Sequence, residues 1–268
     1  MFRKFIFSVT IVIFSFQGLY SQTDTTKWND IYGLGSYMMT NARVYGISFG
    51  AYSPSSNKQK TNGIRLQLAS WAFLLPLAPS AKYFPGDSAL IEGRKYFPVQ
   101  ATVNGIDISP MGALLKKSNG IAVGWCHMIE ESNGITFSLM LSETAVQRGI
   151  SLSGINLVNT VYGGQFGGMF ALSNRLNGIQ FSLASSTARI MKGLQGSFFC
   201  KADTMNGVQI GIINSAINSN GVQIGFFNFA TKTKGIQIGL VNRTISDRAF
   251  QIGLININSS GFFPIINW

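Results

Sequence analysis

The sequence predicts an all-β protein built from tandem repeats of 14 to 15 residues, with a β-solenoid as the favoured arrangement. Three observations lead there: glycine recurs at that spacing, apolar residues alternate after each glycine, and glutamine or asparagine recurs at fixed places in the unit. Composition agrees, because only 12% of the 268 residues are charged while 30 are glycine. That bias favours sheets and tight turns over solvated helices.

A column of glycines sets the register of the repeat. Its members are Gly105, Gly120, Gly134, Gly149, Gly163, Gly178, Gly193, Gly207, Gly221 and Gly235, with Ala249 at the next place. We number each unit from this glycine as position 1. A short period that persists over so many units is typical of a stacked architecture, in which each unit packs on the next.

Positions 2, 4 and 6 are mostly Ile, Val, Leu or Phe, as from Val208 to Ile212, and we expect this alternation to give a strand whose apolar face is buried. Position 3 is glutamine in Gln165, Gln180, Gln195, Gln209, Gln223, Gln237 and Gln251. Position 8 is asparagine in Asn156, Asn214, Asn228, Asn242 and Asn256. The apolar residue at position 7 breaks the alternation and indicates a corner, and the frequent Asn-Gly pair at the start of the unit indicates a second.

Three arrangements can use this unit. In a β-solenoid each unit is one coil, and parallel stacking sets glutamine on glutamine and asparagine on asparagine, so that side-chain amides form ladders. An outer-membrane β-barrel fits the low charge and the terminal Trp268, but it needs about 9 to 11 alternating residues per strand. A soluble antiparallel meander is the third possibility.

The chain divides into three predicted parts. Residues 1–21 carry Arg3 and Lys4 before the apolar run Phe5 to Phe16, which predicts a secretory signal peptide cleaved near Ser21 and therefore export. Residues 22–104 are expected to form an N-terminal cap or degenerate repeats. Residues 105–268 form the repeat region, and the shortened unit after Gly261 is expected to cap its far end.

The only histidine, His127, follows Cys126, but adjacent residues of a strand face opposite ways and do not form a catalytic pair. Together with Glu130 and Glu131 these residues lack the spacing of a metal site, so we interpret the stretch as a variable surface corner. Cys200 lies five coils from Cys126, too far for a disulfide, and both are expected to be buried.

Enzymatic activity is not expected, and no catalytic, metal or cofactor-binding residue is assigned. The glycine pairs of the repeat lack the Lys and Ser/Thr of a phosphate loop, so no cofactor is predicted. Glu131 and Glu143 are nearly one coil apart and supply only a weak signal for a polysaccharide-acting enzyme, which is the third functional hypothesis.

The formal net charge of +11 favours an anionic surface polymer or glycan as partner, whereas no specific nucleic-acid motif is found. Nine basic residues fall at positions 12 to 15, and stacking would align them as an edge that fits a polyanion. They are Lys116, Lys117, Arg148, Arg175, Arg189, Lys192, Lys232, Lys234 and Arg248.

The units at 207–214, 221–228 and 235–242, with the ending Phe263-Pro264-Ile265-Ile266-Asn267, resemble a bacterial surface-repeat family of exported, largely uncharacterised proteins of spirochaetes and Bacteroidota. The resemblance is strongest over residues 193–268. It implies a cell-surface or outer-membrane setting and brings no activity or site residues. We therefore expect a structural or adhesive role, exerted through the glutamine-bearing face or the basic edge, with a small integral outer-membrane β-barrel as the alternative.

Overall fold

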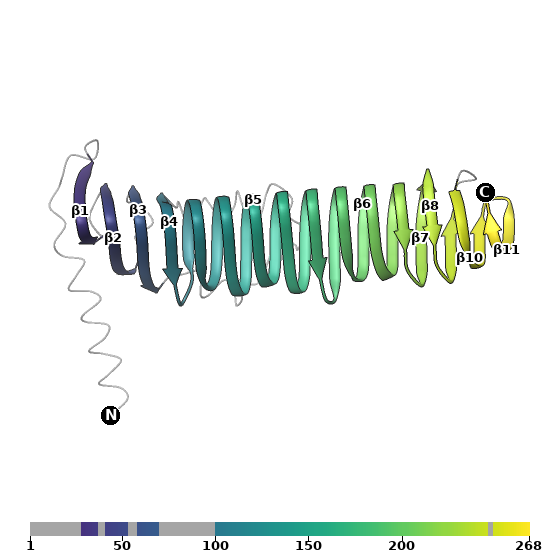
Figure 1. The fold of residues 1–268 in the computed structure, drawn as a ribbon, viewed down its shortest axis with the longest axis horizontal. Coiled ribbons are helices and arrows are strands. Elements are labelled where there is room, and N and C mark those ends of the chain that lie inside the picture. The colour runs from purple at the N-terminus through teal and green to yellow at the C-terminus, as the bar shows by residue number, and fades with distance from the viewer. Residues whose placement is uncertain (1–27, 37–40, 53–57, 70–99, 246–248) are drawn as a thin grey trace, which may run out of the picture.

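A computed structural model describes residues 28–36, 41–52, 58–69, 100–245 and 249–268. These residues form a β-solenoid of about 12 turns, drawn as a stack of coils in Figure 1. The predicted leader lies outside the described residues. In the part of the chain that the structure describes, no helix is long and apolar enough to cross a membrane.

The strands follow one another along the stack. They are β1 (Asn29–Ser36), β2 (Ala42–Tyr52), β3 (Gln59–Ala69), β4 (Ala101–Ser109), β5 (Ala113–Ser182), β6 (Ser185–Ile224), β7 (Phe227–Thr233), β8 (Gly235–Ile238), β9 (Val241–Thr244), β10 (Ala249–Asn258) and β11 (Gly261–Asn267). β5 and β6 contain several coils each, because the chain stays extended through its corners. All eleven strands belong to one sheet.

Neighbouring coils run parallel and in register, which confirms the solenoid. Gly46 pairs with Gly63 and Gly63 with Gly105, so the glycine column extends into the N-terminal strands. Gln223 pairs with Gln237 in the same manner. A closed barrel and a meander both require antiparallel neighbours, so these two alternatives are wrong.

The C-terminal strand is the exception to the parallel order. β11 runs antiparallel to β10 and covers the last coil. Its Asn267 side chain donates a hydrogen bond to Oε1 of Gln251 at 2.8 Å, where another glutamine would otherwise stand. The last glutamine of the column therefore receives its hydrogen bond from the shorter amide of an asparagine on the antiparallel strand.

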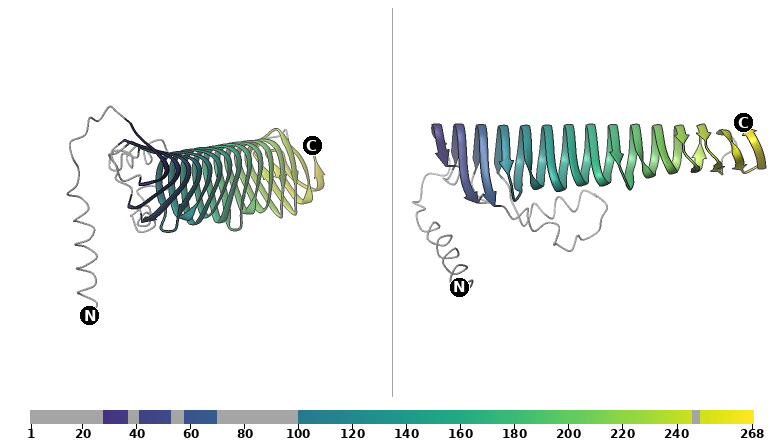
Figure 2. Two further views of the ribbon diagram at one scale, coloured as in Figure 1. Left: turned by 60° about the vertical axis from the view of Figure 1, so that its left-hand side comes forward. Right: turned by 60° about the horizontal axis from the view of Figure 1, so that its bottom comes forward.

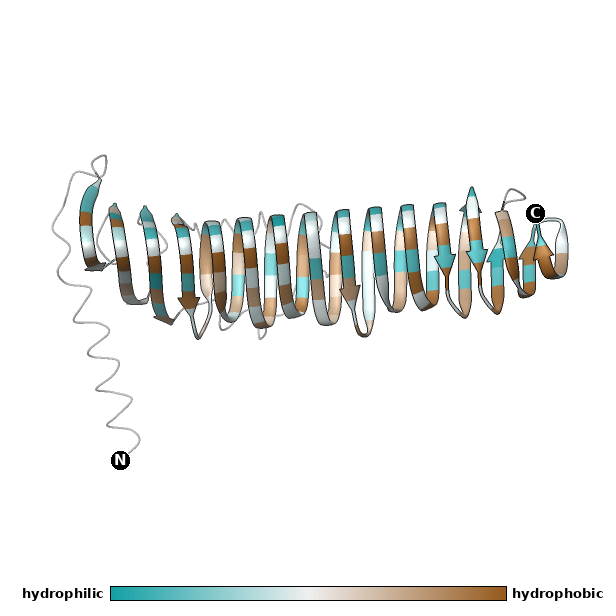
Figure 3. Ribbon diagram, viewed as in Figure 1, coloured by the Kyte–Doolittle hydropathy of each residue, from teal (hydrophilic) through white to brown (hydrophobic). Residues whose placement is uncertain are grey.

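The interior holds the residues that were expected outside. Every position-3 glutamine from Gln165 to Gln251 is fully buried, and so are Asn214, Asn228 and the other position-8 asparagines. The apolar residues at positions 2 and 4 point outward, and Figure 3 shows hydrophobic and hydrophilic bands alternating along each coil. The prediction that the apolar face of the strand is buried is thus wrong, because amide ladders supply the buried groups with hydrogen bonds.

A second part of the interior is apolar. Val161, Leu176, Met191 and Met205 lie two residues before successive column glycines and pack with small alanines such as Ala188. Figure 2 shows the coils stacked along one axis, so this apolar part runs from coil to coil. The core therefore combines an amide half with an aliphatic half.

Candidate functional site

The glutamine ladder is the most regular feature of the interior. Each Nε2 donates to Oε1 of the preceding glutamine at 2.7 to 2.9 Å, from Gln180 through Gln251. Most of these amides also reach a carbonyl across the core, as Gln180 does to Ala171 O at 3.0 Å. Burying a primary amide is costly without partners, and the ladder removes that cost by pairing each amide with its neighbours.

A second ladder, formed by the position-8 asparagines, also links successive coils. Nδ2 of Asn214, Asn228 and Asn242 donates at 2.8 Å to Oδ1 of the next asparagine toward the C-terminus. The same amide group donates to a carbonyl of the following coil, at 2.8 Å for Asn214 to Ile224 O. The bend of the coil falls at positions 5 and 6, as between β8 and β9, so the corner lies slightly before the predicted place. The position-8 asparagine stands in the strand that follows, where its side chain holds two coils together.

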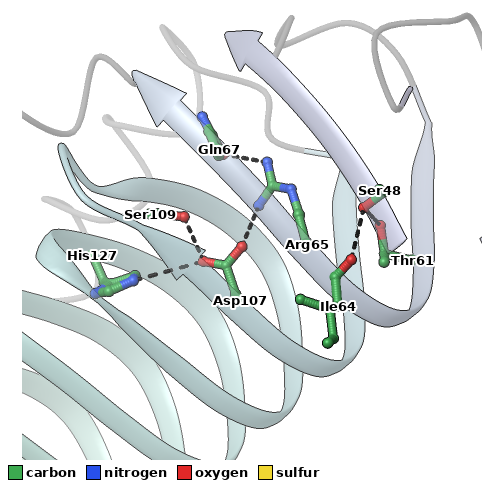
Figure 4. A network of polar contacts seen from close by, with 8 residues as sticks. All are labelled: Ser48, Thr61, Ile64, Arg65, Gln67, Asp107, Ser109 and His127. Atoms are coloured by element: carbon green, nitrogen blue, oxygen red, sulfur yellow. Dashed lines mark hydrogen bonds and ion pairs between the residues drawn. The ribbon is translucent and has the colours of Figure 1, made fainter. Parts of the chain in front are cut away.

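A buried charged cluster replaces the glutamine ladder near the N-terminal end (Figure 4). Arg65 and Asp107 occupy position 3 of adjacent coils, and Nη1 of Arg65 lies 3.1 Å from Oδ1 of Asp107. Arg65 also donates to Gln67, and the Ser109 hydroxyl donates to Oδ2 of Asp107 at 2.8 Å. His127 Nε2 lies 3.7 Å from the same oxygen. Arg65, Asp107 and His127 are almost completely inaccessible to solvent.

The ionisation of Asp107 is set by these neighbours. Burial would raise the pKa of the carboxyl, but the charge of Arg65, the contacts with His127 and the Ser109 hydroxyl together outweigh it, so the pKa of Asp107 lies below its ordinary value. Asp107 is therefore an acceptor that holds Arg65 in place inside the solenoid.

Asp107→Asn is expected to lower the unfolding free energy by about 2 kcal/mol at pH 7, because the amide keeps the shape but leaves Arg65 without a carboxylate. In the parent, unfolding below the ordinary aspartate pKa of about 3.9 takes up a proton, so this contribution is present above that pH and lost as pH falls. The variant should show a flatter profile in urea titrations between pH 7 and pH 3. Asp203→Asn, an exposed carboxylate 3.8 Å from Arg189, is the control; parallel profiles for Asp107→Asn and the parent would contradict the prediction.

The placement of His127 corrects the sequence interpretation. The stretch was predicted to be a surface corner, but it lies within β5, and His127 is fully buried because it occupies position 8, the inward position that asparagine fills in later units. Its Nδ1 lies 2.8 Å from the Ser138 hydroxyl. Asp107, His127 and Ser138 thus have the residue types of a hydrolytic triad, but all three are enclosed in the solenoid and a substrate has no access to them.

Both cysteines are buried and unpaired, as expected from their separation along the stack. Burial raises the pKa of the Cys126 thiol and of the Cys200 thiol. The described residues contain no cluster of three or more His, Cys, Asp or Glu side chains that could hold a metal ion.

The two glutamates of the weak enzyme signal have separate surroundings. Glu131 forms ion pairs with Lys117 at 3.2 Å and with Arg148 at 3.9 Å. Glu143 stands in another column, and burial raises its pKa. Glu131 and Glu143 lie on adjacent coils, as their spacing in the sequence indicated, but their surroundings differ.

The nine residues of the predicted basic edge occupy several columns. Arg148, Lys192 and Lys234 directly precede column positions, whereas Lys117, Arg175 and Lys232 lie three residues before them. Lys116 and Arg189 lie four residues before the column glycines. Lys117, Arg148 and Arg189 are engaged in ion pairs, and Arg248 lies outside the described ranges.

A hollow of about 460 Å³ lies at the N-terminal end of the same corner region. Its lining includes four lysines, Lys58, Lys60, Lys116 and Lys117, together with Glu130 and Glu131. Sequence reasoning missed this hollow, because Lys58 and Lys60 precede the regular repeat and share its register only through β3. The excess of lysine suits an anionic group.

The largest surface feature is the outer face formed by positions 2 and 4, which we name the apolar face. Position 2 contributes Ile47, Ile64, Ile106, Ile121, Ile135, Ile150, Ile179, Leu194, Val208, Val222, Ile236 and Phe250; position 4 contributes Phe49, Leu66, Ile108, Val123, Phe137, Leu152, Phe166, Phe181, Ile210, Ile224, Ile238 and Ile252. The gaps in these columns are glycines: a Cβ on Gly164 would meet the ring of Phe166, and one on Gly196 would meet the ring of Phe181. The apolar face therefore runs along the rod.

The opposite sheet is polar by comparison. Its outward positions carry charged or amide side chains such as Lys116, Asn174 and Asp203 beside a smaller number of apolar ones such as Ile217 and Ile245. No charged residue occupies positions 2 or 4 in the coils that the structure describes. The rod is thus amphiphilic along its length.

No family model, curated protein or solved structure matches this chain.

Proposed function

We propose that this chain is an exported structural protein of the cell surface or outer membrane, which serves as a stiff rod and performs no catalysis. The observation that carries the proposal is the unbroken stack, in which hydrogen-bonded amides link successive coils from Gln165 to Asn267. Backbone and side chains then form parallel hydrogen-bonded columns along one axis. We expect such a stack to resist bending and local opening, because each coil is hydrogen-bonded to its neighbours through both backbone and side chains.

Export is supported by the sequence of the first 21 residues and by the resemblance of the repeat to surface-repeat proteins. A non-catalytic role is supported by the burial of the reactive side chains: His127, Ser138, Cys126 and Cys200 all face the interior. The adhesive role now falls on other surfaces than the glutamine-bearing face, because that face is enclosed.

The proposal is tested by producing the full chain in a Gram-negative host and identifying its location and its N-terminus. We expect a product that lacks residues 1–21, sediments with the outer membrane or is digested by protease added to intact cells. Val12→Arg, which places a charge in the apolar run, should keep the chain in the cytoplasm. Recovery of the parent chain in the cytoplasm with Met1 still present would overturn the proposal.

A second candidate role is adhesion to an anionic polymer at the lysine-lined hollow. Lys58, Lys60 and Lys116 converge there, and their charge exceeds that of the neighbouring glutamates. We expect Lys58→Glu with Lys60→Glu to lower the salt concentration at which the protein elutes from a sulfated polysaccharide resin. The matched control is Lys232→Glu with Lys234→Glu, which makes the same charge change far along the rod; equal shifts for both pairs would show attraction by net charge alone and would overturn the hollow as the site.

A further inference from the structure

The apolar face is too large to be left in water. From Ile47 to Ile252, its most exposed side chains are each between 37% and 47% accessible, so the face is even in height. About 12 coils at about 4.8 Å give a length of roughly 55 Å, and five residues of strand give a width of about 16 Å. The resulting area of about 900 Å² exceeds the roughly 600 Å² that a soluble monomer exposes as one apolar patch.

The regularity of the face restricts what can cover it. Side chains stand in two straight columns, spaced by the coil repeat, because the coils pair in register from Ile47 on Ile64 to Ile236 on Phe250. A partner must present apolar side chains at the same spacing to fill the gaps between them. A second copy of this chain has that spacing along its entire face.

Charge and area agree with a second copy. Neither column carries a charged side chain in the described coils, so two such faces meet without burying an unpaired charge. Pairing would bury about 1,800 Å² in total, within the range of stable protein interfaces. Sheets that pack face to face in this manner lie about 10 Å apart with interdigitated side chains.

We propose that the apolar face is buried against the same face of a second copy, which gives a closed pair of rods. The pair has an apolar seam and exposes the opposite sheet of each copy to water. This pairing does not depend on where the cell places the protein. A twofold axis relates the copies, because each uses the same surface.

The experiment is sedimentation velocity on the purified chain from about 0.1 to 100 μM, without detergent. We expect a dimer in the parent, and at least a 100-fold weaker dimer for Ile210→Lys with Ile224→Lys, which places two charges on adjacent coils of the seam. The control is Ile217→Lys with Thr231→Lys, also on adjacent coils but outward on the opposite sheet, and it should stay within about threefold of the parent.

Circular dichroism and the urea midpoint show whether each variant remains folded. A parent chain that is monomeric at 100 μM would overturn the proposal. So would equal weakening by both pairs of substitutions, or no weakening by the seam pair. Flotation of the parent as a monomer with phosphatidylcholine vesicles would assign the face to lipid and would also overturn the pairing.

Discussion

Gln209→Glu is expected to be the most damaging single substitution in the repeat, lowering the unfolding free energy by about 5 kcal/mol at pH 7. Gln209 donates from Nε2 to Gln195 and accepts at Oε1 from Gln223, both within the buried ladder. A carboxylate can accept from Gln223, but it places a second acceptor against Gln195 and a charge in a fully buried column. The stack should therefore open at this coil.

Lowering the pH should restore much of this loss. A buried carboxyl without a cation has a raised pKa, and its protonated form can donate to Gln195 as the original amide does. We expect the difference in unfolding free energy from the parent to shrink between pH 7 and about pH 4 in urea titrations.

The control for Gln209→Glu is Ile217→Glu, which puts the same carboxylate on an outward position of the opposite sheet and should change stability by about 0.5 kcal/mol or less. If the two variants were equally mild, the glutamine column would not be inside. Greater damage from the Ile217 variant would contradict the observed orientation directly.

Gly178→Ala should destabilise the solenoid by about 4 kcal/mol. Gly178 has a φ of 141°, and an added Cβ would stand 2.1 Å from the carbonyl oxygen of Gly163 in the preceding coil. Gly178 cannot withdraw without disturbing the pairing of β5 with β6, in which it lies opposite Gly193. Strain and steric overlap therefore add at one residue.

Gly33→Ala separates these two effects. Gly33 also has a positive φ, of 87°, but no atom of the described chain lies within 4 Å of an added Cβ. We expect it to cost only the backbone strain, about 1 to 2 kcal/mol. Urea titration followed by circular dichroism gives both values, and similar losses for Gly178→Ala and Gly33→Ala would show that coil-to-coil contact is not the reason for the glycine column.

The sequence predicted the stacking of the coils but not which face of the coil lies inside, and it placed one corner two residues too late. Identical residues at positions 3 and 8 required a parallel, in-register stack, and that inference is confirmed by Gln223 on Gln237 and Asn214 on Asn228. Alternation shows that two faces differ in polarity without showing which is inside. Positions 2 and 4 carry no charged residue, but this did not reveal the orientation of the coil, because side chains buried in an apolar core would also be uncharged.

The buried charged cluster was missed for a related reason. Arg65 and Asp107 stand at position 3, and His127 stands at position 8, so the register placed all three on the columns that are now seen to be inside. His127 was predicted to lie on the surface because the stretch was interpreted as a variable corner, so its contact with Asp107 was not foreseen. The close approach of Gly178 to Gly163 could not have been predicted from the Asn-Gly pair, because it depends on the distance between coils rather than on the local turn.

The reversed direction of β11 has a consequence for how long this molecule can be. Asn267 occupies the place where the next glutamine would extend the column, and an incoming coil from another chain would meet a strand running the opposite way. The parallel, in-register stacking of the coils therefore does not continue past β11. The length of the described stack is thus set by its number of coils, at about 4.8 Å for each coil.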